Sequence, residues 1–323
     1  MRNRKFFPLH SLVLALLFVL VALQWGYGQK PAPTEKTPLL IIDTNVGDDK
    51  DIHNFRKMSD PFVKTAGKLP SREGLDSLQA SGSAQFSEEG LRGIKQRLKG
   101  KDIVIMDLRQ ECHGFLNGTP VSWKAVHNWE NVGKSIAEVT AEENKRLRKA
   151  FNDEIIVIYR VIDKDDDDEY VPESMAVKSA ASEKEACEKE KVWYSRIAVT
   201  DHRRPSDDTV DRFVKYVRDM KKGTWLHFHC KAGKGRTATF LAMLDMMRNA
   251  RKVSIDDIVL RQYLLGGANL FPHTEPGSWK YPYEKEREEF VRKFYQYCRE
   301  NQDGFRTGWS EWLSSKKAAP PKS

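Results

Sequence analysis

The sequence is poor in cysteine and histidine. It has four cysteines and eight histidines in 323 residues, and their spacing matches no zinc-binding pattern, so we predict neither a metal site nor a cofactor. So few cysteines also exclude a miniprotein held together by disulfides. In an exported protein an even number of cysteines would permit two disulfides. The motif described below needs a free thiol at Cys230, which leaves at most one pair among Cys112, Cys187 and Cys298.

Long apolar runs are also scarce. One uninterrupted run, Leu12–Leu23, follows the basic residues Arg2, Arg4 and Lys5. It is shorter than the roughly 20 residues that span a bilayer, and its flanks favour a cleaved signal peptide over an uncleaved anchor. We therefore predict a signal peptide at 1–28 and a leader segment at 29–46. The mature protein is expected to be exported, either to the periplasm or outside the cell, without stable membrane association.

Acidic residues are outnumbered by basic ones. Lys and Arg total 54 against 46 Asp and Glu, so the formal charge is +8, and 40% of the residues are hydrophobic. This hydrophobic share suffices for a sizeable core and excludes a disordered chain or a collagen-like repeat. A basic surplus favours an anionic partner, which could be a nucleic acid, an anionic membrane or a phosphorylated substrate. Charge alone does not choose among these three.

No internal repeat is visible, but strand and helix patterns alternate. Segments rich in β-branched and aromatic residues predict strands at Leu39–Ile42, Ile103–Asp107, Ile155–Ile162, Trp193–Val199 and Thr224–His229. Helix-capping patterns begin at Ser135, Ser182 and Ser254. This alternation predicts an α/β domain with a largely parallel sheet.

Two stretches fit this alternation less well. Residues from about Gly47 to Gly82 are rich in turn formers, and Asp163–Glu169 is an acidic run. The acidic run lacks the glycine and the distal glutamate of a helix-loop-helix calcium loop. We therefore interpret it as the solvated tip of a hairpin.

The segment Trp193–Ala250 carries the chemistry. A strand, a loop and a helix that starts at Ser206 are followed by a second strand, a second loop and a helix that Thr237 opens. A right-handed crossover makes the two strands parallel, so both loops lie at carboxyl ends, where open α/β sheets bind ligands. Asp201 in the first loop and Cys230 in the second are therefore predicted to be neighbours.

The second loop, Cys230–Arg236, has the composition of a phosphate cradle. Gly233 and Gly235 permit a tight turn that directs backbone N–H groups inward, and the helix N-terminus adds partial positive charge. Arg236 can grip two phosphate oxygens. A thiolate at Cys230 would then be a nucleophile in line with the leaving oxygen. Asp201 could protonate that oxygen and Thr237 could hydrogen-bond the sulfur.

Competing interpretations of this loop are weaker. A nucleotide-binding Walker loop would need GxxxxGK[ST], which is absent from the segment. A core cysteine in a glycine-rich turn would explain neither the following threonine and helix nor the upstream loop that carries Asp201. His229, on the apolar strand before the cysteine, is interpreted as a buried orienter of the loop rather than as a base.

Several segments of the sequence resemble those of a known family. HCKAGKGRT at His229–Thr237 resembles the signature of the cysteine-dependent, protein-tyrosine-phosphatase superfamily. The loop is similar to that of inositol-lipid phosphatases, which also carry two lysines, although Ala238 stands where those usually have glycine. NFR at Asn54–Arg56, SGSAQFS at Ser81–Ser87, DLRQECHGF at Asp107–Phe115 and TDH at Thr200–His202 resemble the bacterial tyrosine-phosphatase-like phytases. The resemblance extends from about Asn54 to Leu313.

The resemblance implies a fold and an activity. It implies an α/β phosphatase core with a mostly parallel central sheet and an inserted small partial β-barrel domain, together spanning 47–315, and a C-terminal tail at 316–323. The small domain would absorb the two stretches that fit less well. The activity would be stepwise hydrolysis of phytate (myo-inositol hexakisphosphate) and lower inositol polyphosphates through a phosphocysteine intermediate, without a metal.

The resemblance also implies residue roles. Cys230 matches the nucleophile, Arg236 the phosphate-binding arginine and Asp201 the general acid. Positions that match substrate contacts, or that line the loop, are Arg56, His202, Lys231, Ala232, Gly233, Lys234, Gly235, Lys280 and Arg287. Two departures from the family pattern are Arg287, where a lysine is expected, and Asn128, where an acidic residue is common. The tryptophans of the C-terminal segment, Trp309 and Trp312, are expected to pack against the core.

Two other functions remain open at this stage. One is a protein-tyrosine or phosphoinositide-lipid phosphatase, although no phosphotyrosine-recognition loop and no lipid-binding module is evident. The other is an inactive phosphate-binding module, which would have no need of Cys230, Arg236, Asp201 and Thr237 together. In each case we expect a monomer that binds a small molecule and no nucleic acid.

Overall fold

The computed structural model describes residues 32–43, 52–64, 67–162, 169–271 and 273–318. The predicted signal peptide, most of the acidic run and the last five residues of the C-terminal tail lie outside the described residues. The chain from Pro33 onward is one compact unit. None of the helices described is both long and apolar enough to cross a membrane.

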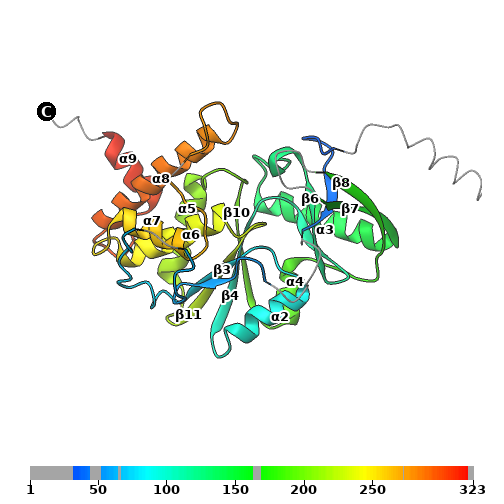
Figure 1. The fold of residues 1–323 in the computed structure, drawn as a ribbon, viewed down its shortest axis with the longest axis horizontal. Coiled ribbons are helices and arrows are strands. Elements are labelled where there is room, and N and C mark those ends of the chain that lie inside the picture. The colour runs from blue at the N-terminus through cyan, green and yellow to red at the C-terminus, as the bar shows by residue number, and fades with distance from the viewer. Residues whose placement is uncertain (1–31, 44–51, 65–66, 163–168, 272, 319–323) are drawn as a thin grey trace, which may run out of the picture. The chain divides into compact units, whose positions relative to one another are not determined.

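A five-stranded sheet forms the centre of this unit. Its order is β10-β4-β11-β3-β2, with only the edge strand β2 antiparallel to its neighbour (Figure 1). The strands are β2 (Arg56–Lys57), β3 (Ala80–Ser83), β4 (Asp102–Arg109), β10 (Trp193–Val199) and β11 (Thr224–His229). The mostly parallel sheet expected from the sequence is thus confirmed. β2 and β3 come from the turn-rich stretch, so the expectation that the small domain absorbs this stretch is wrong for these two strands, which pair within the central sheet.

Both faces of this sheet are covered, which explains why its central strands read as continuous apolar runs. Val104 and Met106 pack with helices α5 and α6, whereas Ile103 and Ile105 pack with helix α2. The helices of the unit are α2 (Glu88–Arg97), α3 (Ile136–Asn152), α4 (Glu183–Lys189), α5 (Asp207–Asp219), α6 (Gly235–Asn249), α7 (Ile255–Leu264), α8 (Tyr281–Glu300) and α9 (Trp309–Ala318).

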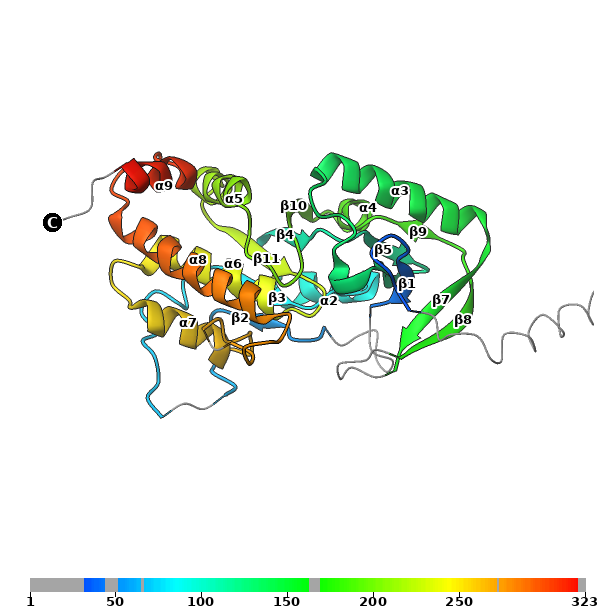
Figure 2. The same cartoon turned by 90° about the horizontal axis from the view of Figure 1, so that it is seen from above.

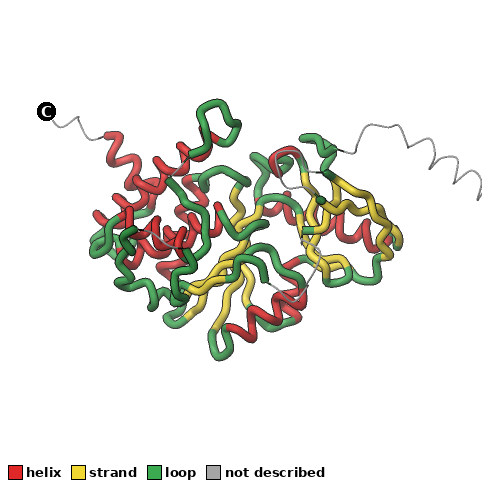
Figure 3. The backbone as a smooth tube through the Cα atoms, viewed as in Figure 1, coloured by secondary structure: helices red, strands yellow, loops and turns green. Residues whose placement is uncertain are grey.

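A second, six-stranded sheet has the order β8-β7-β1-β6-β5-β9. Its pairs are antiparallel except β1 with β7, and helix α3 lies along it (Figure 2; strands are yellow in Figure 3). The strands are β1 (Leu39–Ile42), β5 (His113–Leu116), β6 (Thr119–Lys124), β7 (Ile155–Val161), β8 (Tyr170–Ala176) and β9 (Ala180–Ala181). β1 lies in the predicted leader segment, so that part of the leader is a strand. The α/β fold class with a second β unit is confirmed.

The helix starts follow the sequence signals closely. Ser135 and Ser182 form reciprocal capping boxes, and Ser206 and Ser254 accept hydrogen bonds from the third residue beyond them. Helix α6 differs from expectation because it begins at Gly235 rather than at Thr237. The first turn of α6 therefore contains both Arg236 and Thr237, which places the arginine predicted to bind phosphate at the helix N-terminus.

The C-terminal tryptophans pack as expected. Trp309 is 1% exposed, and its ring lies 5.7 Å from those of Phe290 and Tyr297. Its Nε1 donates to Asp207 Oδ1 on α5 at 3.0 Å. Helix α9 is therefore held by a buried aromatic cluster and by directed hydrogen bonds, among them this one and the one from Trp312 Nε1 to Glu300 Oε2.

This packing predicts a large loss of stability for Trp309→Ala. Truncating a fully buried tryptophan removes its contacts and leaves a cavity, which typically costs about 3–5 kcal/mol. Urea unfolding should show this decrease, whereas Ser314→Ala on the exposed side of α9 should change the free energy of unfolding by less than about 0.5 kcal/mol. A decrease of less than about 1 kcal/mol for Trp309→Ala would contradict the packing role.

Candidate active site

Three loops meet at the carboxyl end of the parallel strands. The loop after β11 carries Cys230, the loop after β10 carries Asp201, and β4 lies between those two strands. The sequence predicts the first two as neighbours, and the structure places Asp201 Oδ1 3.1 Å from Arg236 Nη2. The intervening β4 adds a third segment, Arg109–Glu111, which the sequence analysis left without a role.

The carbonyl groups of the loop from Cys230 to Lys234 accept hydrogen bonds from residues outside the loop. Gln85 N donates to Lys231 O at 3.0 Å, Asn54 Nδ2 to Ala232 O at 2.9 Å, and Arg56 Nη1 to Gly233 O at 2.9 Å. Because each peptide bond is trans, the N–H that follows each of these carbonyls points the opposite way. Three successive N–H groups are thus directed to the inside of the loop, as an anion cradle requires.

Gly233 is required by this close approach. Its φ is +68°, and a Cβ at this position would lie 2.4 Å from the backbone nitrogen of Ala84. A side chain would therefore both strain the backbone and push the loop away from the segment that fixes it.

Cys230 lies at the base of the cradle and is 3% exposed. Thr237 Oγ1 donates to Cys230 Sγ at 3.2 Å. The guanidinium groups of Arg56 and Arg236 both lie near enough to Cys230 to interact with it electrostatically. All four cysteines are free thiols. The predicted contact between threonine and sulfur is present.

Arg236 is fixed by a carboxylate that sequence reasoning missed. Its Nη1 and Nη2 donate to the two oxygens of Glu111 at 2.7 and 2.9 Å. Burial raises the pKa of Glu111, but Arg236 and Arg109 outweigh burial and hold it well below its usual range. The guanidinium of Arg236 therefore reaches the cradle already oriented and charged.

Asp201 receives several hydrogen bonds at once. Asn128 Nδ2 donates to its Oδ2 at 2.8 Å, the N–H of His202 donates to its Oδ1 at 3.1 Å, and Trp129 Nε1 donates to its carbonyl at 2.9 Å. Burial raises the pKa of Asp201, as does Glu111, but Arg236, His202 and the hydrogen bond from Asn128 together outweigh these two effects, so the pKa is lowered. Asp201 is ionised in the site as it stands.

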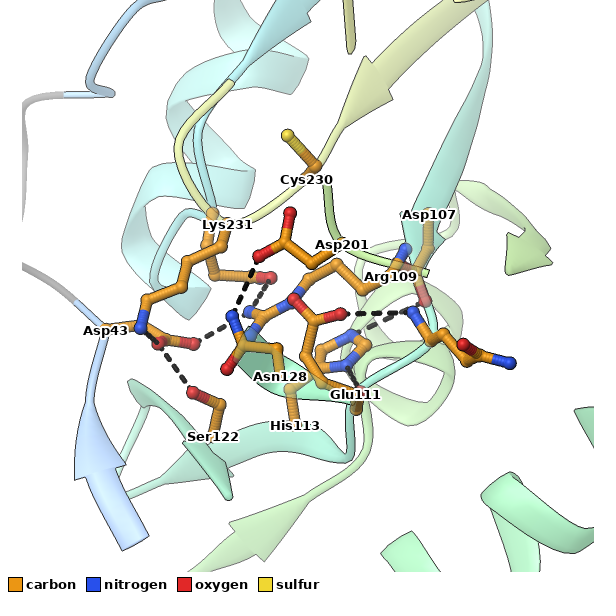
Figure 4. Close-up of polar contacts among 12 residues, drawn as sticks. Asp43, Asp107, Arg109, Glu111, His113, Ser122, Asn128, Asp201, Cys230 and Lys231 are labelled. Atoms are coloured by element: carbon orange, nitrogen blue, oxygen red, sulfur yellow. Dashed lines mark hydrogen bonds and ion pairs between the residues drawn. The ribbon is translucent and has the colours of Figure 1, made fainter. Parts of the chain in front are cut away.

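Buried charges connect this site to the second sheet (Figure 4). Arg109 binds Glu111 Oε1 at 2.9 Å and Asp43 Oδ2 at 2.7 Å, and Ser122 of β6 also donates to Asp43. Lys231 of the cradle lies 3.5 Å from Asp43. A chain of ion pairs thus runs from Asp43, which follows β1 of the second sheet, through Arg109 and Glu111 to Arg236.

The predicted substrate-binding residues differ in their burial and in the groups they contact. Arg56 is 3% exposed and Arg287 9% exposed, and burial lowers the pKa of each, to about 10 for Arg56. Lys234 Nζ donates to Gly266 O at 2.7 Å. His202 and Lys280 both flank the ring of Trp279, at 4.8 and 5.6 Å from its centroid. Arg56 and Lys234 therefore shape the loop as well as adding charge to it.

Other residues near the site were also missed or left open. Asn128, one of the two departures from the family pattern, contacts the general-acid candidate directly. Lys124, the last residue of β6, lies near enough to Lys231 and Asp201 to interact with their charges, and burial lowers its pKa to about 8. His229 is fully buried, with Nε2 2.7 Å from Glu183 Oε1, which fits a residue that orients the loop. Glu111 lies in the DLRQECHGF segment and Asn128 stands where the family pattern has an acidic residue, but neither observation indicates which residue it contacts. Only the structure shows that Glu111 binds Arg236 and that Asn128 binds Asp201.

Comparison with known proteins gives consistent matches. Residues 106–248 match the family model of PTP-like phytases, whose description is inositol hexakisphosphate. The chain is 39% identical to a PTP-like myo-inositol phosphatase from Mitsuokella multacida solved with myo-inositol-(1,3,4,5)-tetrakisphosphate, with a TM-score of 0.78, covering 92% of this chain and 52% of that one. A PTP-like phytase from Bdellovibrio bacteriovorus is 33% identical, with a TM-score of 0.67, covering 89% of this chain and 98% of that one.

A curated relative carries a different description. Effector protein hopD2 of Pseudomonas syringae pv. tomato is 28% identical over 303 residues, which is 88% of this chain and 62% of that protein. The chain thus spans about half of the Mitsuokella structure and less than two thirds of the effector protein.

The contact between Arg236 and Glu111 predicts that Glu111→Gln lowers turnover of every phosphate monoester. Glutamine keeps one acceptor and removes the charge, so Arg236 loses half of its bidentate partner and Asp201 becomes its main counter-charge. Losing a buried charged hydrogen bond costs about 1–3 kcal/mol, or roughly 5- to 150-fold in kcat/KM. Steady-state assays with an aryl phosphate would measure this. Glu190→Gln, at a partly exposed ion pair with Arg92, is the control, and equal activities of the two variants would contradict the role of Glu111.

Proposed function

Because the chain belongs to the family of PTP-like phytases, we propose that it is a phosphoric monoester hydrolase that removes phosphate groups stepwise from phytate and lower inositol polyphosphates. The observation that carries the proposal is the grouping of Cys230, Thr237, Arg236 and Asp201 around one anion cradle. Each of these side chains has a distinct task in transfer of a phosphoryl group, and simple phosphate binding would need only the cradle.

In the first step Cys230 Sγ attacks the phosphorus of the phosphate held in the cradle. The S–P bond forms as the bond between phosphorus and the inositol oxygen breaks, and the electron pair of that bond goes to the leaving oxygen. Asp201 gives its proton to this oxygen. Arg236 and the inward N–H groups balance the charge on the phosphoryl oxygens.

In the second step water attacks the phosphocysteine. Asp201, now ionised, takes a proton from the water, and the P–O bond forms as the S–P bond breaks. Thr237 Oγ1, which donates to Cys230 Sγ at 3.2 Å, stabilises the departing thiolate. No redox partner or metal is needed to balance either step.

The protonation state of Asp201 links binding to catalysis. Arg236 favours its ionised form in the free site, whereas the first step requires the protonated form. A phosphate dianion in the cradle offsets the charge of Arg236 and adds a like charge near Asp201, so it raises the pKa of Asp201. Activity should therefore be highest at acidic pH and fall as Asp201 loses its proton.

The surroundings of the cradle favour a substrate with several phosphates. Lys231 and Lys234 lie in the loop, Arg56 binds the carbonyl of Gly233, and Arg287 Nη1 lies beside Gly235. His202 interacts electrostatically with Arg236, Arg287 and Lys280, so six basic or protonatable groups lie in the loop or are linked to it. A ring that carries several phosphates brings its other anionic groups against them when one phosphate occupies the cradle. The tetrakisphosphate complex of the Mitsuokella protein supports this substrate class for the present chain.

Export is proposed on the N-terminal sequence alone. A basic start followed by the apolar run Leu12–Leu23 favours a cleaved signal peptide and delivery to the periplasm or outside the cell. We also propose that the mature protein works as a monomer.

The test of the function is phosphate release from three substrates at equal concentration: phytate, a phosphotyrosine peptide and an inositol lipid. Phytate should be hydrolysed fastest, and a chelator should leave the rate unchanged. Cys230→Ser should abolish turnover but retain substrate binding, because a serine alkoxide does not form near neutral pH. A faster rate on the phosphotyrosine peptide, or strict dependence on added metal, would contradict the proposal, as would more than a few per cent activity in the serine variant.

A second prediction concerns the positive charge of Lys280. Lys280→Ala should raise KM for phytate several-fold and leave KM for a small aryl phosphate unchanged, because only the larger ligand reaches this side chain. One exposed charge contact is worth about 0.5–1 kcal/mol at low salt and less at high salt. The difference between the two substrates should therefore shrink as salt rises.

The matched control is Lys285→Ala, which removes an exposed lysine from the same helix terminus. It should leave both KM values within twofold of the parent enzyme. Equal effects of the two variants on phytate would assign the change to net charge rather than to a contact at Lys280.

A further inference from the structure

Asn128 approaches the general-acid candidate from the second sheet. It follows β6 through the short 3₁₀ turn η2 (Val126–Asn128) and adopts a left-handed backbone, with φ of +62°. The residue is 7% exposed, and its Nδ2 lies 2.8 Å from Asp201 Oδ2 (Figure 4). Its neighbour Trp129 holds the carbonyl of the same aspartate at 2.9 Å, so two successive residues fix the position of Asp201.

We propose that Asn128 is a positioning residue that stabilises the ionised carboxylate of Asp201 and thereby sets the pH above which the enzyme loses its general acid. This inference rests on the proposed phosphatase function. The amide Nδ2 is a donor only, so in this orientation it favours a carboxylate over a carboxylic acid. Asn128 therefore acts on catalysis through Asp201 and needs no contact with the substrate.

The two oxygens of Asp201 are held by different groups. Oδ1 lies beside Arg236 Nη2, at 3.1 Å, and accepts from the N–H of His202. Oδ2 accepts from Asn128. The oxygen next to the phosphate-gripping arginine is thus the one directed toward the cradle, and Asn128 anchors the other. A bound phosphate would offset the charge of Arg236, whereas the hydrogen bond from Asn128 lies on the opposite side of the carboxylate and would persist.

Other charges also bear on this carboxylate. Burial raises its pKa, as does Glu111, whereas the cations near it lower the pKa. The titratable and charged groups that interact with Asp201 come from the neighbouring elements and are Arg236, Glu111, His202, His127, Lys124 and Arg287. A substitution at position 128 leaves all of them in place, so it isolates the contribution of the amide.

An acidic residue at this position would have the opposite effect. Two carboxylates in contact cannot both be ionised at low cost, so they share one proton and the pKa of the pair rises. Asn128→Asp is nearly isosteric and should shift the alkaline limb of kcat/KM upward by about one pH unit or more. Asn128→Ala only removes a donor and should shift the limb in the same direction by a smaller amount.

The experiment compares two substrates that differ in their need for an acid. Phenyl phosphate has a poor leaving group and requires protonation, whereas a nitrophenyl phosphate has a good leaving group and requires little. For phenyl phosphate the alkaline limb should move upward in both variants. For the nitrophenyl ester kcat at low pH should stay within about threefold of the parent. A merely structural role would lower both rates together and leave the position of the limb unchanged.

The matched control is Asn131→Asp. Asn131 is also buried, lies three residues further on, and donates from Nδ2 to Gln110 O at 3.1 Å rather than to Asp201. It adds the same charge to the same segment and should leave the limb in place. An unchanged limb in both Asn128 variants, or an equal shift in Asn131→Asp, would overturn the proposal. Neither outcome depends on phytate, so failure of the parent enzyme to hydrolyse phytate would contradict only the proposed substrate.

Discussion

Glu111 and Arg236 form a bidentate ion pair beneath the phosphate cradle, and both side chains are buried. Burying two charges is unfavourable unless each finds its partner with good geometry. This requirement fixes the end of β4 against the start of α6, and through Arg109 and Asp43 it extends to β1 of the second sheet. The orientation of the phosphate-binding arginine is therefore established when the protein folds, before any substrate arrives.

The cradle depends on a second constraint, which is the close approach of the chain around Gly233. Donors from Gln85, Asn54 and Arg56 engage the outer carbonyls of the loop. Trans peptide geometry then turns the N–H groups inward. Arg56, which the family pattern suggests as a substrate contact, thus also acts as part of the scaffold. A buried arginine can serve both purposes, because one of its nitrogens binds the loop while its charge remains near Cys230.

The proposed mechanism and the surroundings of Asp201 favour opposite protonation states of its carboxyl group. In the proposed mechanism it must hold a proton to release the inositol oxygen, yet Arg236 and Asn128 both favour its ionised form. A bound phosphate changes the balance at Arg236 and leaves Asn128 untouched. The acid is thus adjusted from two sides, by the substrate through the cradle and by the second sheet through one amide. In the proposed mechanism, this arrangement gives the second sheet a part in catalysis as well as in support of the fold.

The sequence by itself determined the central chemistry. Strand boundaries at Trp193–Val199 and Thr224–His229, the capping serines, and the spacing of Cys230, Arg236 and Thr237 all follow from local rules of periodicity, turn formation and helix initiation. Tertiary structure alone decided what lies between those loops. β4 inserts between β10 and β11 and brings Glu111 to Arg236, and the second sheet brings Asn128 to Asp201 and Asp43 to Lys231. These partners are far apart in the chain, and no local pattern records which distant charge a buried side chain will meet, because only the packing of the sheets sets their distances.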